Sequence, residues 1–286
     1  HPAYDYGTPE GAVDALRSPN LAARYKAWNA LLQMGTATRH ALQMSIENPN
    51  PRLRARGLWV LAATADSPQD AIEIALRDES DDIRALALRI ARRHQTPVEP
   101  VVERLVNDKS IIVRRECAVS LHRLQSETSA QLWTEIAIQY DGKDRWYLEA
   151  LGIGAVGKET ECLNAWRNRV GEKWKTSGHR DIVWRSRAPE AATLLASLLL
   201  APDIPATEHP RLLRALDFHN GQHKQAALTA LLKSDPKHNP VVWLEAFQRA
   251  SPEFIKAHPD ISERAGSVML SSKGTVTFVD LVARFN

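Results

Sequence analysis

The chain has 286 residues and a formal net charge of +3, with 37 Lys and Arg against 34 Asp and Glu, a balance too mild to indicate nucleic-acid binding by itself. Its longest apolar run, Leu194 to Ala201, is far shorter than the roughly 20 residues that cross a bilayer, so we expect no membrane span. The two cysteines form no Cys-x-x-Cys motif and predict neither a zinc site nor covalent haem. Because the first residue is His1 rather than Met, we expect a segment of a longer protein.

Arginine recurs at a fixed spacing along the N-terminal half. Arg24, Arg54, Arg84 and Arg114 follow one another at a constant interval, and Arg145 continues the series with a single extra residue before it. Six positions before three of these arginines stands a residue that can accept hydrogen bonds in a turn: Asn48, Asp78 and Asp108. A period of about 30 residues is typical of repeat proteins.

Each period has the pattern of two helices. The first helices begin with a hydroxyl residue followed by Pro, which predicts helix caps at Thr8, Ser67 and Thr96. The second helices carry apolar residues at a spacing of three and four, as at Val113 and Cys117. A helix pair cannot bury its apolar face alone, whereas stacked pairs can, so the period predicts an all-α fold of the α-α superhelix or solenoid type.

The helix pairs, the acid in the turn and the Arg one turn into the second helix resemble HEAT repeats over about residues 10 to 155. In that family the turn acid and the Arg form a ladder along the stack. The resemblance assigns this structural ladder to Asn48, Arg54, Asp78, Arg84, Asp108 and Arg114. We therefore interpret these arginines as structural, with ligand binding as the less favoured alternative.

The regular period is lost beyond Lys158, although helical patterns continue. We expect regular repeats over residues 1–155 and divergent helical repeats over residues 156–286 that continue the same superhelix. Near the boundary, Gly152, Gly154 and Gly157 predict close helix packing or an early helix end. The later helical patterns cover Cys162 to Trp174, Pro189 to Leu200, Arg211 to Phe218, His223 to Leu232, Pro240 to Ala250 and Thr275 to Phe285.

Tryptophan and charged residues gather in three segments and suggest a recognition groove. Its candidate residues are Asp144, Arg145, Trp146, Tyr147, Trp184, Arg185, Arg187, Asp217 and His219. Trp beside Arg can stack on a sugar or anchor a protein partner, so a carbohydrate or a partner protein is the expected ligand. The favoured interpretation is nevertheless that these side chains only close the junction between the two halves, with Trp in the core and Arg in buried ion pairs. We predict no metal at Asp217, His219 and His223, because Gly221 interrupts the helix that the two histidines would need to share.

A basic cluster on two neighbouring second helices supports a rival interpretation. It contains Arg89, Arg92, Arg93, Arg114, Arg115 and Arg123. Curved helical-repeat DNA glycosylases hold the DNA backbone with a similar lining. The low net charge and the acids between these arginines argue against nucleic acid in this chain.

Three motifs together resemble the helical segment of large exported bacterial proteins of the planctomycete and verrucomicrobial type, known as membrane-bound dehydrogenases and c-type haem-binding proteins. The motifs are Tyr140 to Gly152, Asp181 to Pro189 and Arg214 to His219. The resemblance implies an N-terminal β-propeller similar to sugar dehydrogenases, HEAT-like helices and a C-terminal cytochrome domain. It also implies an exported location, periplasmic or in the cell envelope.

The sequence itself offers no Ser/His/Asp or Cys/His arrangement for nucleophilic catalysis and no Cys-x-x-Cys-His motif for haem. We therefore expect no catalytic residue and no cofactor in this segment, with haem only in a flanking domain. The prediction is a non-catalytic scaffold or interaction module. Its expected partners are the neighbouring domains of the same polypeptide or a separate protein.

Overall fold

The computed structural model describes residues 3–65, 68–271, 273–274, 279 and 283. These residues form helices joined by turns and short loops, with no strand among them, which confirms the predicted all-α class. The chain falls into two compact units. Unit 1 comprises His1–Gln139 and Arg145–Lys158, and unit 2 comprises Tyr140–Asp144 and Glu159–Asn286.

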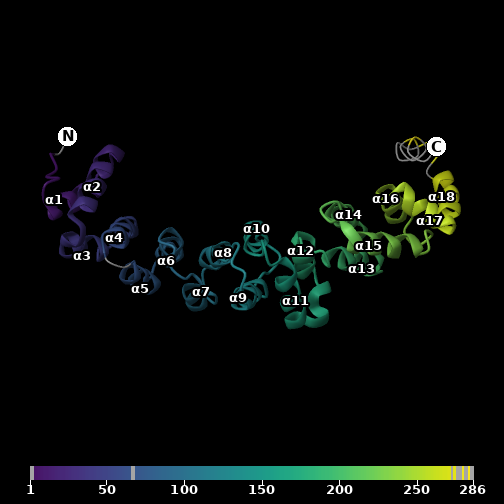
Figure 1. Ribbon diagram of the computed structural model, residues 1–286, viewed down its shortest axis with the longest axis horizontal. Helices are drawn as coiled ribbons and strands as arrows, with labels where there is room; N and C mark the ends of the chain where they lie inside the picture. The colour runs from purple at the N-terminus through teal and green to yellow at the C-terminus, as the bar shows by residue number, and fades with distance from the viewer. Residues whose placement is uncertain (1–2, 66–67, 272, 275–278, 280–282, 284–286) are drawn as a thin grey trace. The chain divides into compact units, whose positions relative to one another are not determined.

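Unit 1 consists of consecutive helix pairs (Figure 1). Its first helices are α1 (Pro9–Ala15), α3 (Arg39–Ile46), α5 (Gln69–Leu76), α7 (Glu99–Leu105) and α9 (Glu127–Ala137). Its second helices are α2 (Leu21–Met34), α4 (Pro51–Thr64), α6 (Asp81–Arg93), α8 (Ile111–Ser120) and α10 (Arg145–Gly154). A short 3₁₀ helix, η1 (Gly35–Thr38), leads from α2 into α3.

Helices two apart in the chain pack against each other in unit 1, which creates two layers. The second helices contact one another in the order α2, α4, α6, α8 and α10. In the other layer α1 contacts α3, α5 contacts α7, and α7 contacts α9. Figure 1 shows α4, α6, α8 and α10 along one side of this unit and α5, α7 and α9 along the other. Each pair thereby buries the apolar face that it cannot bury alone.

Local chemistry explains where some of these helices begin. The Thr8 hydroxyl accepts a hydrogen bond from the Gly11 amide at 3.3 Å, so the predicted cap of α1 is confirmed. The predicted cap at Thr96 is wrong, because its hydroxyl donates to the Ala91 carbonyl and closes the end of α6 instead. Helix α7 starts three residues later, after Val98. The predicted cap at Ser67 lies outside the described residues.

Close packing of α8 against α10 depends on a glycine. A Cβ atom at Gly154 would lie 2.3 Å from the Ala118 carbonyl oxygen, so the predicted close approach is confirmed at this position. The buried ammonium group of Lys158 donates to the carbonyls of Leu121 and Gly154, at 2.7 and 2.8 Å. These bonds satisfy acceptors just beyond α8 and at the end of α10.

Unit 2 is also built from helices. They are α11 (Glu159–Val170), α12 (Ser177–Arg185), α13 (Ala191–Leu200), α14 (His209–Leu216), α15 (Gly221–Lys233), α16 (Pro240–Arg249), α17 (Pro252–Ala257) and α18 (Pro259–Ser271), with 3₁₀ helices η2 (Gly171–Lys175) and η3 (Ala206–Glu208). The helical patterns from Cys162 to Ala250 fall on these helices. The pattern from Thr275 to Phe285 lies outside the described residues except at positions 279 and 283, and α17 and α18 were not predicted.

Helices two apart also pack together in unit 2. Helices α12, α14, α16 and α18 contact one another in that order, and α13 contacts α15. Side-chain hydrogen bonds join Thr160 to Glu190, 30 residues on, and Asp181 to Arg211, again 30 residues on. A repeat spacing near that of unit 1 therefore recurs in the contacts of unit 2, although the arginine pattern that reveals it in unit 1 stops at Lys158.

The stretch from Tyr140 to Ala155 is divided between the two units. Within unit 2, Gly142 has a φ of +81°, and a Cβ atom there would lie 3.1 Å from the Gly178 Cα atom at the start of α12. The Tyr140 hydroxyl lies 3.4 Å from an Asp181 carboxylate oxygen on the same helix. The turn residues 140–144 therefore pack as part of unit 2, whereas α10 packs as part of unit 1.

Candidate functional site

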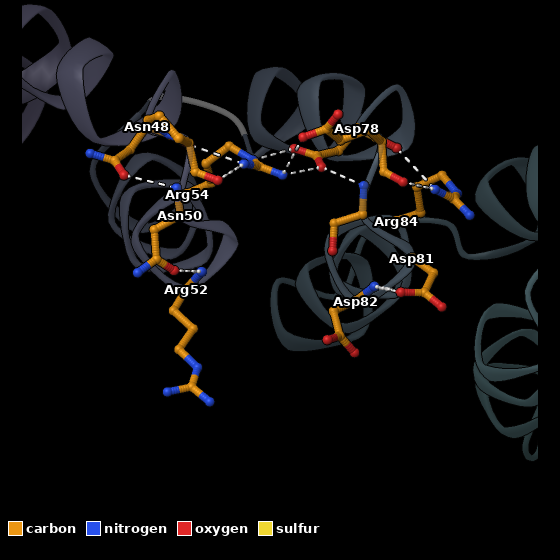
Figure 2. A network of polar contacts seen from close by, with 11 residues as sticks. Asn48, Asn50, Arg52, Arg54, Asp78, Asp81, Asp82 and Arg84 are labelled. Atoms are coloured by element: carbon orange, nitrogen blue, oxygen red, sulfur yellow. Dashed lines mark hydrogen bonds and ion pairs between the residues drawn. The ribbon is translucent and has the colours of Figure 1, made fainter.

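The ladder of unit 1 is built from paired hydrogen bonds between repeats. Arg54, on α4, donates from Nε and Nη2 to the two carboxylate oxygens of Asp78, at 2.8 and 2.7 Å. Its Nη1 donates to the backbone carbonyls of Asn48 and Pro49, both at 3.0 Å. Figure 2 shows this guanidinium between its own turn and the turn of the next repeat. We call this two-bond pair a clamp.

A second clamp repeats the geometry one period later. Arg84, on α6, donates from Nε and Nη2 to Asp108 at 2.6 and 2.9 Å, and from Nη1 to the carbonyls of Asp78 and Glu79 at 3.0 and 2.9 Å. The amide of Ser110 donates to the same Asp108 carboxylate at 2.8 Å. The Asp108 carboxylate therefore accepts hydrogen bonds both from Arg84 of the preceding repeat and from the Ser110 amide of its own turn.

Burial makes the charges of the clamps interdependent. The side chains of Arg54 and Asp78 are 8% and 9% exposed, and those of Arg84 and Asp108 are 10% and 8% exposed. The hydrogen bond with Asp108 raises the pKa of Arg84, and the same bond lowers the pKa of Asp108. Both groups stay ionised because each stabilises the charge of the other.

The ladder changes at its first step. Arg24 donates from Nη1 to the carbonyls of Ser18 and Pro19, at 2.7 and 2.9 Å, as the clamp arginines do in their own turns. Each clamp arginine binds an Asp in the turn of the next repeat, 24 residues further on. The residue 24 positions after Arg24 is Asn48, whose side chain is neutral. The side-chain oxygen of Asn48 accepts from the Asn50 amide at 2.9 Å. Within the described residues, Arg24 therefore has no counterpart of the carboxylate that Arg54 and Arg84 bind.

The ladder also changes at Arg114. Its Nη1 donates to the Asp108 carbonyl at 2.6 Å, but within the described residues its buried Nε has no hydrogen-bond partner. The guanidinium carbon lies 5.8 Å from the centre of the Tyr147 ring, a cation–π contact. An aromatic ring thus takes the place of the turn acid beside Arg114.

Three of the candidate groove residues belong to unit 1 and differ in burial. Arg145 donates to Glu149 in its own helix at 2.9 Å and its side chain is 70% exposed, unlike the buried clamp arginines. Trp146 is 72% exposed, whereas Tyr147 is 1% exposed and donates its hydroxyl to the Ile136 carbonyl at 2.8 Å. Tyr147 therefore belongs to the core, and Trp146 belongs to the surface.

The other candidate groove residues belong to unit 2. The Trp184 indole donates to the Arg211 carbonyl at 3.1 Å, and the Arg187 guanidinium carbon lies 4.2 Å from the centre of the Phe218 ring. Arg185 ends α12. Asp144 lies in the turn segment Tyr140–Asp144. Within unit 2 the structure thus brings Arg187 close to the segment that follows α14, where Asp217 and His219 lie.

Asp217 and His219 have separate surroundings. Asp217 accepts from Arg249 at 2.8 Å. His219 is 6% exposed, and its Nε2 is buried without a hydrogen-bond partner within the described residues. Burial, followed by the charges of Arg187 and Lys224, lowers the pKa of His219 to about 4. The histidine is neutral at physiological pH. Helix α14 ends at Leu216, and Gly221 is the first residue of α15 rather than the end of a helix.

A polar network in unit 2 was missed by the sequence reasoning. Arg180 donates to both carboxylate oxygens of Glu208, and Arg211 donates to Glu208 at 2.9 Å and to Asp181 at 2.6 Å. The hydrogen bond from Arg180 lowers the pKa of Glu208. Burial, followed by the charge of Asp181, raises the pKa of Tyr140 to about 12. The available signal was that Asp181 and Arg211 are separated by one full period of the arginine pattern.

A cleft of about 530 Å³ lies on the second-helix layer of unit 1 and was also missed. Its lining includes Arg89, Ile112, Arg115, Glu116, Trp146 and Ile153. The repeat register could have revealed it, because Arg115 and Trp146 directly follow Arg114 and Arg145 of the arginine series and so occupy the same position in neighbouring repeats. Sequence reasoning instead grouped Trp146 with Trp184, which lies in unit 2.

The basic cluster that suggested nucleic-acid binding is partly neutralised. Arg89 donates to Glu116 at 2.9 and 2.7 Å, and Arg92 donates to the other oxygen of the same carboxylate. Arg114 is engaged in the ladder as described. Glu116, one of the acids between the arginines that the sequence indicated, therefore forms ion pairs with two of them.

Thiol and metal chemistry is limited in the described part of the chain. Cys117 and Cys162 are both buried and form no disulfide within the described residues, and they belong to different units. Burial raises the pKa of the Cys117 thiol far above its usual value, which suppresses the reactive thiolate. Among the described residues, no group of three or more His, Cys, Asp or Glu is placed to hold a metal ion.

Neither a scan against models of protein families nor a search of curated proteins finds a match to this chain. The resemblance to the exported dehydrogenase proteins therefore stays a prediction from the three motifs. Across the residues that the structure describes, no helix is both long enough and apolar enough to cross a membrane.

Proposed function

We propose that this chain is a non-catalytic helical-repeat scaffold that fixes the spacing between parts of a larger protein or between partner proteins. The observation that carries the proposal is the buried clamp, Arg54 with Asp78 and Arg84 with Asp108. Each clamp joins the second helix of one repeat to the turn of the next. A guanidinium edge that already holds a carboxylate through two hydrogen bonds is not open to a ligand. These charges therefore serve the stack itself.

The clamps favour a stiff stack. Removing one partner of a buried ion pair leaves an uncompensated charge, at a cost of about 3–5 kcal/mol. In repeat proteins the stability is approximately a sum of terms for each repeat and for each interface between neighbours. A clamp across an interface raises the free energy needed to open that interface. Resistance to opening is the property that a spacer between two functional domains requires.

The motif resemblance suggests what the scaffold separates. In the exported proteins that the motifs resemble, an oxidising β-propeller precedes the helical segment and a c-type cytochrome domain follows it. We infer that this chain holds two such domains at a defined separation in the periplasm or cell envelope. On this proposal, haem belongs to the flanking cytochrome domain, and this segment requires no cofactor of its own.

The test uses the parent protein that contains this chain. Haem reduction after substrate addition is followed by stopped-flow absorbance in the natural protein and in the Asp78→Ala variant. This substitution removes the carboxylate that Arg54 binds. We expect slower haem reduction with a wider spread of rates, because a looser stack holds the two domains at variable separations. An unchanged rate with a single phase would overturn the proposal.

A matched control keeps this test interpretable. Asp70→Ala removes the partner of Arg39 in an ion pair whose side chains are 65% and 52% exposed, so it deletes the same type of group from the same unit without opening a buried interface. Asp70→Ala should leave the rate unchanged. Circular dichroism of both variants shows whether the helices remain folded.

A further inference from the structure

The cleft on the second-helix layer of unit 1 exposes a cluster of apolar side chains. Trp146 is 72% exposed, and beside it Ile153 and Ile112 are 40% and 36% exposed. The core of this helix is supplied by the next residue, Tyr147, which is buried and hydrogen-bonded. A large rigid aromatic side chain that stays exposed among aliphatic ones is typical of the central anchor of a binding surface.

Cationic side chains surround this apolar surface. Arg89 and Arg92 share the single carboxylate of Glu116, so this group of three carries a net positive charge. Arg115 lines the same cleft, and Arg93 is exposed one turn beyond Arg89 on α6. The other carboxylate of the lining, Glu149, forms an ion pair with Arg145. The cleft and its rim therefore favour an anionic occupant.

The mixed lining favours a peptide over other anions. A sugar–phosphate backbone would bring dense negative charge against the carboxylates of Glu116 and Glu149, and it offers no aliphatic group to the isoleucines. A neutral sugar could stack on Trp146 but would leave the net positive charge of the rim unmatched. An acidic peptide supplies carboxylates and apolar side chains together, and Arg binds carboxylates through two hydrogen bonds. The cleft volume of about 530 Å³ suits a few side chains.

We propose that this cleft binds an acidic, amphipathic peptide segment of a partner protein. An apolar side chain of the peptide packs on Trp146 between Ile112 and Ile153. Its carboxylates pair with the guanidinium edges of Arg89 and Arg92 that are not bonded to Glu116. The arginines are prearranged for this role because Glu116 holds both of them beside the cleft. The inference rests on the proposed scaffold function, since it names where the scaffold takes a partner.

A random peptide library displayed on phage tests the proposal on the whole chain. Selection is run in parallel on the natural chain and on Trp146→Ala, whose exposed position leaves folding intact. We expect enriched sequences that combine Asp or Glu with Leu, Ile, Phe or Trp, and we expect this enrichment to vanish on Trp146→Ala. Enrichment of basic or neutral sequences, or no enrichment that depends on Trp146, overturns the proposal.

Affinities of a synthetic enriched peptide are then measured by fluorescence anisotropy. Trp146→Ala should weaken binding by about thirtyfold, as expected for a central Trp anchor. Arg92→Ala should weaken binding less and reduce its salt dependence. The control Tyr25→Ala removes another exposed aromatic side chain of the same layer, 66% exposed on α2 and outside the cleft, and should leave the affinity unchanged.

Rival ligands are measured on the same variants. A short single-stranded DNA and a short glucan oligosaccharide are titrated against the natural chain and Trp146→Ala. Binding of either one in a Trp146-dependent manner, tighter than the peptide, would replace the peptide assignment. Loss of peptide binding in Trp146→Ala leaves the clamps and the haem-reduction test unaffected, so failure of this inference and failure of the scaffold proposal are separate results.

Discussion

Unit 1 and unit 2 use the same arrangement of helices but hold neighbouring repeats together with different side chains. In unit 1 the same bond recurs, from an Arg to an Asp 24 residues further on, at Arg54 and Arg84. In unit 2 the direction of the charge pair varies. Arg180 precedes its partner Glu208, whereas Asp217 precedes its partner Arg249. The helix contacts are regular in both units, but the residue pattern is regular only in unit 1.

The difference shows what a repeat requires. Packing of helices two apart depends on apolar faces, which many residue combinations provide. An ion pair across the interface depends only on opposite charges, so acid and base can exchange places without changing the spacing. Burial differs as well, because the Arg54 and Asp78 side chains are 8% and 9% exposed, whereas Asp217 is 40% exposed. We therefore expect removal of one partner to be more destabilising at a clamp of unit 1 than at the Asp217–Arg249 pair of unit 2.

The largest expected effect is the loss of a buried clamp. Asp108→Ala leaves the Arg84 guanidinium buried without its carboxylate and should destabilise unit 1 by about 4 kcal/mol. The matched change in unit 2, Asp217→Ala, should cost less than about 1 kcal/mol because this pair is partly exposed. Hydrogen exchange followed by mass spectrometry measures the two units separately within one chain. Equal losses in the two units would contradict the comparison.

Lowering the pH should destabilise unit 2 before unit 1, which is the opposite of the order expected for the loss of a clamp. Burial lowers the pKa of His219 to about 4 from 6.5, so between these values the unfolded imidazole binds a proton that the folded one does not. The stabilising effect of the neutral histidine is complete above pH 6.5 and is lost as the pH falls toward 4, by on the order of 3 kcal/mol. The lowered pKa of Asp108 keeps its clamp ionised over this range.

The measurement is hydrogen exchange of the two units at several pH values between the unfolded and folded pKa of His219. Unit 2 should lose protection first, and His219→Phe should remove most of that pH dependence. The exposed His40, changed to Phe in the same way, is the control and should leave it unchanged. If unit 1 loses protection first, or if His219→Phe alters nothing, the assignment of the acid-sensitive group is wrong.

The helix interface at Gly154 tests packing rather than charge. A Cβ atom there would lie 2.3 Å from the Ala118 carbonyl oxygen, so Gly154→Ala should force α8 and α10 apart and cost about 2 kcal/mol. In α18 of unit 2, a Cβ atom at Gly266 meets nothing within 4 Å, and Gly266→Ala should stabilise its helix by about 0.5–1 kcal/mol. Thermal unfolding followed by circular dichroism measures whether each variant is more or less stable than the natural chain. A destabilising Gly266→Ala would indicate an unrecognised contact.

The sequence predicted the helical class and the positions of the ladder residues because both follow from local, periodic signals. Spacing marks the positions of Arg54 and Asp78, and the resemblance to HEAT repeats assigned them to a ladder. The end of the ladder could not, since the ring of Tyr147 beside Arg114 depends on how α10 packs. The predicted Thr96 cap was wrong for a similar reason. The Thr96 hydroxyl could either cap the next helix or bond to the end of α6, and it donates to the Ala91 carbonyl of α6.

The candidate groove was harder to predict than the fold. Trp146, Trp184 and Arg187 were grouped because aromatic and cationic residues often occur in binding sites. Their positions in the sequence do not show to which unit each side chain belongs. The cleft at Trp146 follows from the repeat register, which places Arg115 and Trp146 at equivalent positions. Applying the register to exposed positions as well as to the ladder would have found its lining.

The smallest expected effect is an increase in stability. It tests whether Arg24 can form a clamp when a carboxylate is placed at position 48. Arg24 already donates to the carbonyls of Ser18 and Pro19 as Arg54 does in its own turn, but Asn48 stands where Arg54 finds Asp78. Asn48→Asp supplies a carboxylate at this position and should stabilise unit 1 by about 1 kcal/mol at low salt. Urea denaturation or hydrogen exchange measures the gain.

A double-mutant cycle with Arg24→Leu identifies the source of that gain. If the new carboxylate binds Arg24, the stabilisation disappears in the Arg24→Leu background, because the coupling belongs to the pair. If the gain survives unchanged, it comes from placing negative charge near the N-terminus of α4, which begins at Pro51 shortly after Asn48. Only the first result makes Arg24 an incomplete ladder position, and it would extend the clamp chemistry of unit 1 by one repeat beyond the two present now.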